Sequence, residues 1–266
     1  MVCSLNGKLF SQGSECLNPQ NSSFRSGFGL IETMLFVKGQ IPLWAYHFKR
    51  LGDSIRVLGL DNSFLSEEAC LKWIQALIEE NKIQERCVVR IQYFLEQREV
   101  FLLIETSLPE NLFNQELQKK EIGIALGINL SQDRFSPLKT TSRFSYEIAK
   151  RQAQQAGWYD ALLLNQQNRV VETTISNVFW VKNGIVHTPP IAEGCIAGVY
   201  RSYLLNNLSD SIKETVLEIN SFKNADEIFL TNAVKGIQPI HHFEDRSFEA
   251  KVTEELMREL GTLDVR

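Results

Sequence analysis

Hydrophobic and polar residues alternate along this chain with two different periods, and each period predicts a different kind of element. In the first hundred residues, apolar positions three and four apart predict helices over His47–Leu58 and Ser66–Glu80, the second of which begins with a capping serine. A period of two, or a short β-branched run, predicts strands at Cys3–Leu5, Lys8–Phe10, Gly29–Val37, Ile41–Leu43, Val88–Leu95 and Val100–Glu105. These elements predict a small α+β domain.

The second half of the chain is richer in strand patterns. Strands are predicted at Glu121–Ile128, Asp160–Leu164, Val170–Glu172, Val178–Lys182, Ile185–Thr188 and Glu227–Leu230, and helices at Arg143–Ala156 and Val199–Leu208. The dipeptide Asn183-Gly184 predicts a tight type I′ hairpin, because both of its turn residues need a positive φ.

The polar, proline-containing segment from Ser107 to Lys119 is the predicted linker. It divides the chain into a small N-terminal α+β domain, residues 1–112, and a larger C-terminal domain, residues 113–266. We expect a ligand site in a cleft between them, since domain junctions favour such sites.

Composition narrows the choice of partner. The chain has 266 residues, 44% of them hydrophobic and 23% charged, as in ordinary globular proteins. Its net charge of −4 favours neither nucleic acid nor an anionic membrane surface as a partner. The sequence has no apolar run of membrane-spanning length and no secretory pattern at its start, so we expect a cytoplasmic protein.

The cysteines and histidines do not predict a metal site. The five cysteines form no C-x-x-C pair, and the four histidines do not cluster with carboxylates. We therefore expect reduced, mostly buried thiols.

Glu172 is the most unusual charged residue, because it lies in an otherwise apolar and β-branched run just before the hairpin. Burying a carboxylate is costly unless a charged or hydrogen-bonding group meets it. Either Glu172 lies at a strand end and reaches water, or a ligand cation meets it.

Several motifs together favour the second explanation. They are His47-Phe48-Lys49-Arg50-Leu51, Ser136-Pro137-Leu138-Lys139, the Glu172 strand and Gly198-Val199-Tyr200-Arg201. In this order, from Gly27 to Pro239, the chain resembles the class IV enzymes that use pyridoxal 5′-phosphate (PLP). That family includes branched-chain and D-amino-acid aminotransferases and aminodeoxychorismate lyase. The resemblance implies a two-lobed α+β fold of type IV, with a small N-terminal α/β sandwich lobe, a larger barrel-like C-terminal lobe, and a homodimer.

The resemblance also implies how the coenzyme is held at its reactive end. Lys139 would be the Schiff-base lysine; the alternative is a solvated loop lysine. Glu172 would keep the pyridine nitrogen protonated; the alternative is a carboxylate at a strand edge.

Three segments are implied to hold the phosphate. Arg50 would bind it with its guanidinium fork, unless it is a surface arginine. The backbone amides of Val199 and Tyr200 would bind it at a helix start, and the turn Thr231-Asn232-Ala233 would close around it. For these two segments the alternative is ordinary helix and strand capping.

The remaining candidates concern the substrate and the loop around Glu172. Glu32 and Thr33 follow a glycine-rich segment that resembles the family's G-D-G-x-x-E-T, and Thr33 would act near the substrate. Asn177 matches the family's S-N-x-F and would pin the loop that holds Glu172. Arg90 and Tyr93 would bind a substrate carboxylate, or else pack in the sheet or core.

The same residues serve two reactions. A lyase would convert 4-amino-4-deoxychorismate to p-aminobenzoate and pyruvate, and an aminotransferase would pass an amine to a 2-oxo acid. The chain is short for a branched-chain aminotransferase, Ile31 replaces a tyrosine of D-amino-acid aminotransferases, and Asn232-Ala233 resembles the lyases. We therefore favour the lyase. An aminotransferase is the alternative, and a PLP-binding protein without turnover is a third hypothesis.

Overall fold

We describe the protein from a computed structural model, which covers residues 1–11, 18, 20–61, 65–97, 99–108 and 119–261. The chain forms two compact units. Unit 1 comprises Met1–Leu112 with Leu138–Arg143, and unit 2 comprises Phe113–Pro137 with Phe144–Val265. Each unit has a hydrophobic core of its own. The domain boundary that we predicted between residues 112 and 113 falls in the stretch 109–118, outside the described residues.

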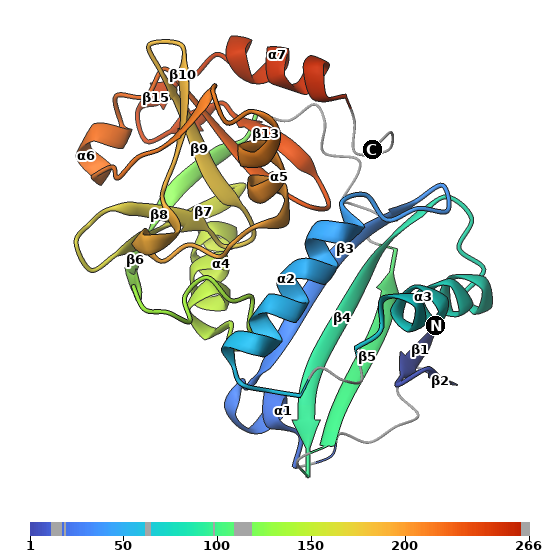
Figure 1. The fold of residues 1–266 in the computed structure, drawn as a ribbon. Helices are drawn as coiled ribbons and strands as arrows, with labels where there is room; N and C mark the ends of the chain where they lie inside the picture. The colour runs from blue at the N-terminus through green and yellow to red at the C-terminus, as the bar shows by residue number, and fades with distance from the viewer. Residues whose placement is uncertain (12–17, 19, 62–64, 98, 109–118, 262–266) are drawn as a thin grey trace. The chain divides into compact units, whose positions relative to one another are not determined.

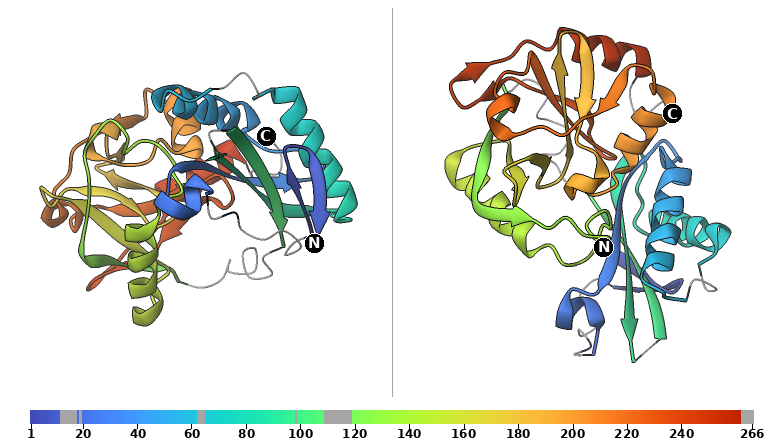
Figure 2. Two further views of the ribbon diagram at one scale, coloured as in Figure 1. Left: turned by 90° about the horizontal axis from the view of Figure 1, so that it is seen from below. Right: turned by 60° about the vertical axis from the view of Figure 1, so that its left-hand side comes forward.

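Unit 1 is built on a five-stranded antiparallel sheet of order β2-β1-β5-β4-β3. Its strands are β1 (Val2–Leu5), β2 (Lys8–Ser11), β3 (Gly29–Val37), β4 (Arg86–Glu96) and β5 (Glu99–Ser107). Its helices are α1 (Ser22–Ser26), α2 (Trp44–Val57) and α3 (Glu67–Glu80). Helices α2 and α3 lie over the same face of the sheet (Figures 1 and 2).

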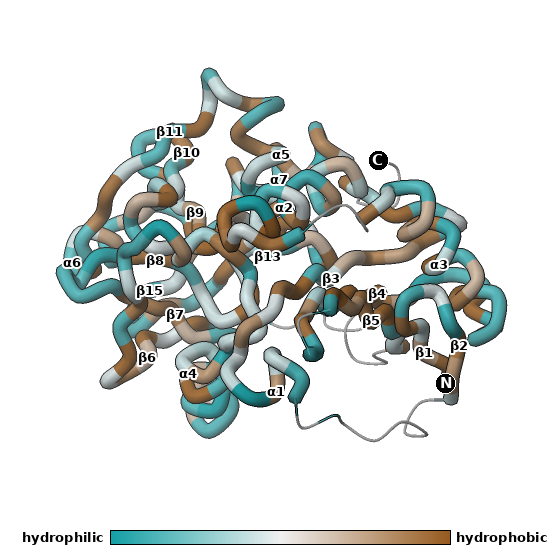
Figure 3. Tube along the Cα trace, turned by 60° about the horizontal axis from the view of Figure 1, so that its bottom comes forward, coloured by the Kyte–Doolittle hydropathy of each residue, from teal (hydrophilic) through white to brown (hydrophobic). Residues whose placement is uncertain are grey.

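The period of two in β3 decides which of its side chains face these helices. Leu30, Met34 and Phe36 are buried in the core of unit 1, where they pack with apolar residues of α2 and α3. Hydrophobic residues dominate β3, β4 and β5, as Figure 3 shows. Glu32 belongs to the same face as these apolar residues, so its carboxylate points under α2.

The strand that we predicted over Ile41–Leu43 is wrong. The turn at Lys38 and Gly39, both with positive φ, allows only a single bridge between Val37 and Gln40. Leu43 then adopts a left-handed conformation, with φ 59°, as the residue that caps α2. The helix begins at Trp44, which leaves too few residues for a returning strand.

Unit 2 contains a ten-stranded sheet whose main path runs β11-β10-β9-β8-β7-β6-β14-β15, with β12 pairing to β9 and β13 to β12. Its strands are β6 (Glu121–Leu130), β7 (Asp160–Asn165), β8 (Val170–Thr173), β9 (Asn177–Lys182), β10 (Ile185–Thr188), β11 (Ile212–Glu214), β12 (Glu227–Asn232), β13 (Gly236–Ile240), β14 (His242–Phe243) and β15 (Arg246–Ser247). Its helical segments are α4 (Phe144–Ala156), η1 (Ile191–Glu193), α5 (Val199–Asn207), α6 (Ile219–Phe222) and α7 (Lys251–Leu260).

The strand pairings of unit 2 correct one expectation and confirm another. Within residues 119–261 the path does not close on itself, so the sheet is open where we expected a barrel-like lobe. The predicted hairpin is confirmed: Lys182 pairs with Ile185, and Asn183 and Gly184 have φ values of 52° and 75°. Helices α6 and α7 and strands β11, β13, β14 and β15 were not predicted from the sequence.

A short segment around Lys139 belongs to unit 1, although we predicted it in the C-terminal domain. The amide of Ile31 donates to the Lys139 carbonyl at 2.8 Å, and the amide of Thr141 donates to the Gly29 carbonyl at 2.9 Å. Leu138 is buried in the core of unit 1. Since β3 is the edge strand of its sheet, this segment satisfies backbone groups that the edge would otherwise leave unpaired.

None of the helices that the structure describes is long and apolar enough to span a membrane.

Candidate functional site

Glu172 is buried on β8, with an exposed fraction of 3%, and three donors converge on its carboxylate. The Tyr146 hydroxyl donates to Oε1 at 2.7 Å. The side-chain amide of Asn177 and the backbone amide of Ile196 each donate to Oε2 at 3.2 Å. Glu172 therefore does not reach water at a strand end, and its hydrogen bonds hold it as a fixed acceptor.

Asn177 ties Glu172 to the loop that precedes α5. Its side-chain amide donates both to Glu172 and, at 2.9 Å, to the Ile196 carbonyl. A Cβ atom added to Gly198 would overlap with the Asn177 side-chain oxygen. Only glycine at position 198 allows the loop to approach Asn177 this closely.

Helix α5 begins where this loop ends. Gly198 is the residue before the helix, and Val199 and Tyr200 form its first turn with both side chains buried. Backbone amides in a first turn have no carbonyl one turn earlier within the helix, and they carry the positive end of the helix dipole. A helix start of this kind is able to bind an anion such as a phosphate.

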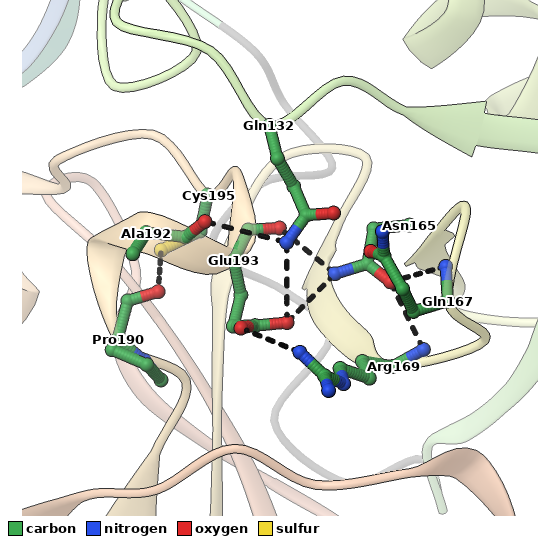
Figure 4. A network of polar contacts seen from close by, with 8 residues as sticks. All are labelled: Gln132, Asn165, Gln167, Arg169, Pro190, Ala192, Glu193 and Cys195. Atoms are coloured by element: carbon green, nitrogen blue, oxygen red, sulfur yellow. Dashed lines mark hydrogen bonds and ion pairs between the residues drawn. The ribbon is translucent and has the colours of Figure 1, made fainter.

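A polar network centred on the buried Glu193 and Asn165 holds the other end of the same loop in place (Figure 4). The Glu193 carboxylate, 5% exposed, accepts from the Asn165 side-chain amide at 2.8 Å and from Arg169 Nη1 at 3.3 Å. The Gln132 amide also donates to Glu193, at 3.5 Å, and to the Ala192 carbonyl at 3.4 Å. These bonds anchor η1, and thereby fix the start of the loop that carries Ile196 and Gly198.

The end of β12 lies against the strand that carries Asn177. Thr231 pairs with Asn177 in the sheet, and its buried hydroxyl has no hydrogen-bond partner among the described residues. The side chain of Asn232 donates to the Ser176 hydroxyl at 3.0 Å and accepts from the Lys235 amide at 2.8 Å. Ala233 lies inside this closed turn.

A second polar group, in unit 1, joins β3 to α2. Arg50 Nε donates to Glu32 Oε1 at 2.7 Å, and Arg50 Nη2 donates to Oε2 at 2.6 Å. Nδ1 of His47 lies 2.6 Å from the same Oε2. Glu32 is 2% exposed and His47 is 1% exposed, so water contributes little to either side chain. These contacts make Glu32 an internal partner of Arg50, whereas a contact between Glu32 and the substrate stays a prediction.

Burial and neighbouring charges set the protonation states of this group. Burial alone would raise the pKa of Glu32, but the Arg50 charge and the hydrogen bonds from His47 and Arg50 outweigh it and lower the pKa to about 2. Burial lowers the pKa of His47, and the positive charges of Arg50 and Lys139 act in the same direction. At neutral pH, Glu32 is a carboxylate and His47 is a neutral ring that donates its Nδ1 proton to it.

Lys139 lies near Glu32 and His47. Its backbone is bonded to β3 beside Glu32, and its positive charge acts on the His47 ring. Unit 1 therefore contains both cationic residues: Lys139 is bonded to the edge strand β3, and Arg50 lies on helix α2.

The remaining candidates lie on both faces of the unit 1 sheet. Thr33 and Arg90 are directly opposite each other in the β3–β4 pairing and share the face away from the helices. Arg90 also binds Glu105 at 3.0 Å. Tyr93 lies on the opposite face, fully buried in the core, and its hydroxyl donates to the Asp61 carbonyl. Tyr93 therefore has the packing role that the sequence left open.

Unit 2 thus brings together most of the predicted coenzyme residues, namely Glu172, Asn177, Val199, Tyr200, Thr231, Asn232 and Ala233. The sequence did not identify Tyr146 and Ile196 as partners of Glu172, or His47 as a partner of Glu32 in unit 1. The spacing of His47 and Arg50 in the H-x-x-R-L motif was a usable signal, because residues three apart lie on one side of a helix. No local pattern identifies Tyr146 or Ile196, which reach Glu172 from other parts of the chain.

A family model matches most of the chain, and known proteins are similar to it over most of its length. Residues 29–243 match the family model described as amino-transferase class IV. The chain is 26% identical to the aminodeoxychorismate lyase of Bacillus subtilis (strain 168), over 92% of this chain and 87% of that protein. It is also 26% identical to a probable branched-chain-amino-acid aminotransferase of Rickettsia bellii (strain RML369-C), over 89% and 85%.

Solved structures with the same fold carry both kinds of name. The branched-chain amino acid aminotransferase of Escherichia coli superposes with a TM-score of 0.86 at 17% identity, covering 98% of this chain and 94% of that one. A putative 4-amino-4-deoxychorismate lyase from Legionella pneumophila superposes with a TM-score of 0.81 at 25% identity, covering 94% and 96%. The two-lobed α+β fold expected from the sequence is confirmed.

Proposed function

Because this chain belongs to the class IV aminotransferase family, and is therefore an enzyme that works with pyridoxal 5′-phosphate, we propose that it cleaves 4-amino-4-deoxychorismate to p-aminobenzoate and pyruvate. The observation that carries the choice of reaction is the turn Asn232-Ala233, which resembles that of the lyases. The similarity to an aminodeoxychorismate lyase over nine-tenths of the chain is compatible with this choice.

The residues of unit 2 fit the coenzyme. Glu172 offers a buried carboxylate whose orientation three donors hold, which suits a protonated ring nitrogen. The start of α5 offers donors to a phosphate, and so does the Thr231 hydroxyl, which has no hydrogen-bond partner within the described ranges. The absence of a side chain at Gly198 keeps the Asn177–Glu172 contact intact next to that helix start. When bound, the coenzyme supplies an electron sink for the bond broken at the substrate carbon that bears the amine.

Each unit contributes different actions. In unit 2, Glu172 would keep a proton on the ring nitrogen, and Asn177 holds Glu172 in place. Val199, Tyr200 and Thr231 would bind the phosphate, with Asn232 and Ala233 forming the turn beside it. In unit 1, Arg50 would bind the phosphate with a charged fork.

Three residues of unit 1, Lys139, Thr33 and Arg90, would act on the substrate. The Lys139 amine takes the proton from C4 of the substrate ring and returns a proton to the methylene carbon of the leaving enolpyruvyl group, while the ether C–O bond breaks. Atoms balance, since the products are p-aminobenzoate and pyruvate alone. Thr33 and Arg90, side by side on one face, would bind a substrate carboxylate.

Product analysis tests the lyase reaction directly. The purified protein, saturated with PLP, is incubated with 4-amino-4-deoxychorismate, and pyruvate is measured through lactate dehydrogenase while p-aminobenzoate is measured by its fluorescence. We expect equal amounts of the two products, and no turnover by Lys139→Ala. Full turnover by that variant would remove the proposal.

The coenzyme link has its own test. Borohydride reduction of the holoenzyme followed by peptide mapping should place the pyridoxyl group on Lys139. A mark on any other lysine would contradict the assignment.

An aminotransferase remains the second candidate, because curated aminotransferases are as similar to the chain as the lyase is. Half-reactions with leucine and with D-alanine, followed by the absorbance of the coenzyme, separate the two activities. Fast amine transfer without pyruvate formation from aminodeoxychorismate would favour the aminotransferase. In either case we expect a homodimer, which sedimentation velocity would measure.

A further inference from the structure

Glu32 lies beside the predicted coenzyme ligands without being one of them. Both of its oxygens are occupied by side chains of α2, Oε1 by Arg50 and Oε2 by Arg50 and His47. We propose that Glu32 is a positioning residue that orients the Arg50 guanidinium for the coenzyme's phosphate, and that His47 holds Glu32 in place. This inference rests on the proposed function of the chain.

The geometry of the guanidinium supports this role. Its Nε and Nη2 atoms bind the two oxygens of one carboxylate, which is the bidentate arrangement that fixes an arginine in its plane as well as in its distance. With that edge facing Glu32, the edge formed by Nη1 and Nη2 faces away from it. The second edge is the one with which Arg50 would bind phosphate.

The state of the carboxylate favours a permanent contact. Glu32 is buried and remains ionised at neutral pH, so its bond to Arg50 does not depend on solvent. A long arginine side chain loses its rotamer freedom when such a pair forms. With Glu32 in place, the coenzyme's phosphate meets a guanidinium whose orientation is already fixed.

Burying His47 is energetically unfavourable at one of its two ring nitrogens, and its contact with Glu32 offsets this. Its Nδ1 atom bonds to Glu32, but its Nε2 atom is buried and has no hydrogen-bond partner among the residues that the structure describes. The surroundings of the ring are largely apolar and include Met34, Trp44, Phe48 and Leu51. An apolar side chain would suit these neighbours better than a ring with an unsatisfied nitrogen. The histidine therefore contributes a hydrogen bond to Glu32 and little to packing.

The test separates phosphate recognition from folding. Dissociation constants are measured for PLP and for pyridoxal, which lacks the phosphate, with the wild-type protein, Glu32→Gln, Arg50→Ala and the double variant. We expect Glu32→Gln to weaken PLP binding about tenfold while it leaves pyridoxal binding within about twofold. In the Arg50→Ala background, Glu32→Gln should have no further effect on the preference for PLP, because Glu32 acts through Arg50.

The opposite result has a clear physical meaning. Removing the charge of Glu32 leaves Arg50 with more uncompensated positive charge, which by itself would strengthen phosphate binding. If Glu32→Gln binds PLP more tightly relative to pyridoxal, or if its effect persists without Arg50, positioning is overturned.

Two further variants guard against a merely structural effect. Glu105→Gln breaks the Arg90–Glu105 ion pair of the same sheet and should leave the preference for PLP unchanged. His47→Leu should reduce that preference about threefold, while its urea midpoint stays equal to or above that of the wild type. A loss of preference only in proportion to lost stability would overturn the inference.

The outcomes also separate this inference from the proposed function. A wild-type protein that binds PLP no better than pyridoxal would overturn both. A wild-type preference for PLP that Glu32→Gln and His47→Leu leave intact would overturn the positioning role alone.

Discussion

Gly198, Asn177 and Glu172 are linked so closely that a change at the first residue reaches the third. The Asn177 side chain occupies the space that a Cβ atom at position 198 would take, and its amide donates to Glu172. A steric change at Gly198 therefore displaces a hydrogen bond of the buried carboxylate.

We predict that Gly198→Ala weakens PLP binding by about tenfold or more, because Asn177 must move away from Glu172 and Ile196. Spectrophotometric titration of the apoenzyme with PLP measures this. Gly52→Ala is the matched control: a Cβ atom at position 52 meets nothing within 4 Å, so PLP affinity should be unchanged. Equal affinities for the two variants would contradict the steric link.

Glu32 makes a second prediction at this scale, for stability as a function of pH. Its pKa is lowered from 4.5 to about 2 in the folded protein, so its contribution to stability is present above pH 4.5 and is lost as pH falls toward 2. The urea midpoint of the wild type should exceed that of Glu32→Gln by a constant amount from about pH 5 to 7, and the gap should narrow below about pH 4.5. A gap that widens with acid would contradict the sign.

At the scale of elements, the sequence predicted the turns and helices that depend on residues close together in the chain. The Asn183-Gly184 hairpin follows from two adjacent residues with positive φ, and the predicted helices α2 and α3 follow from apolar spacing. Ile41–Leu43 has the apolar composition of a strand, but the turn before it and the helix after it leave no room for pairing.

Pairings between distant parts of the chain could not be predicted from the sequence. The segment Leu138–Arg143 joins unit 1 through bonds to Gly29 and Ile31, more than a hundred residues earlier, and nothing in its composition indicates that partner. Likewise, the motif identified Arg50, but the sequence did not show that its fork binds Glu32. The sequence was enough to name candidate ligands, but the contacts that hold those ligands in place were visible only in the folded structure.

Two glycine-to-alanine substitutions, one in the hairpin and one in α2, should change the stability in opposite directions. Gly184→Ala places a side chain at φ 75°, which should destabilise the protein by about 1–2 kcal/mol. Gly52→Ala lies inside α2 in an open position and should stabilise it by about 0.5–1 kcal/mol. Urea unfolding followed by circular dichroism measures both, and a shift of the same sign in the two variants would contradict the conformational argument.

At the scale of the whole molecule, each unit depends on a core of its own that contains buried thiols. Cys3, Cys70 and Cys87 lie in unit 1 and Cys195 lies in unit 2, all of them buried and reduced. Burial raises the pKa of Cys70 to about 11, of Cys87 to about 12 and of Cys195 to about 12, so thiolate is scarce near neutral pH.

We therefore predict that a Cys16→Ser variant, which leaves only these four cysteines, does not react within minutes with 5,5′-dithiobis(2-nitrobenzoate) at pH 8. In concentrated urea all of them should react at once. Absorbance at the thionitrobenzoate band measures both, and one fast thiol in the folded protein would contradict the burial.

The pairing of Leu138–Arg143 with β3 has a practical consequence for dissecting the molecule. A gene fragment that stops near residue 108 would encode every strand of the first sheet but would lack the piece that shields its border. Such a fragment should aggregate by recruiting other copies at that border, whereas supplying residues 138–143 on a flexible tether should keep it in solution.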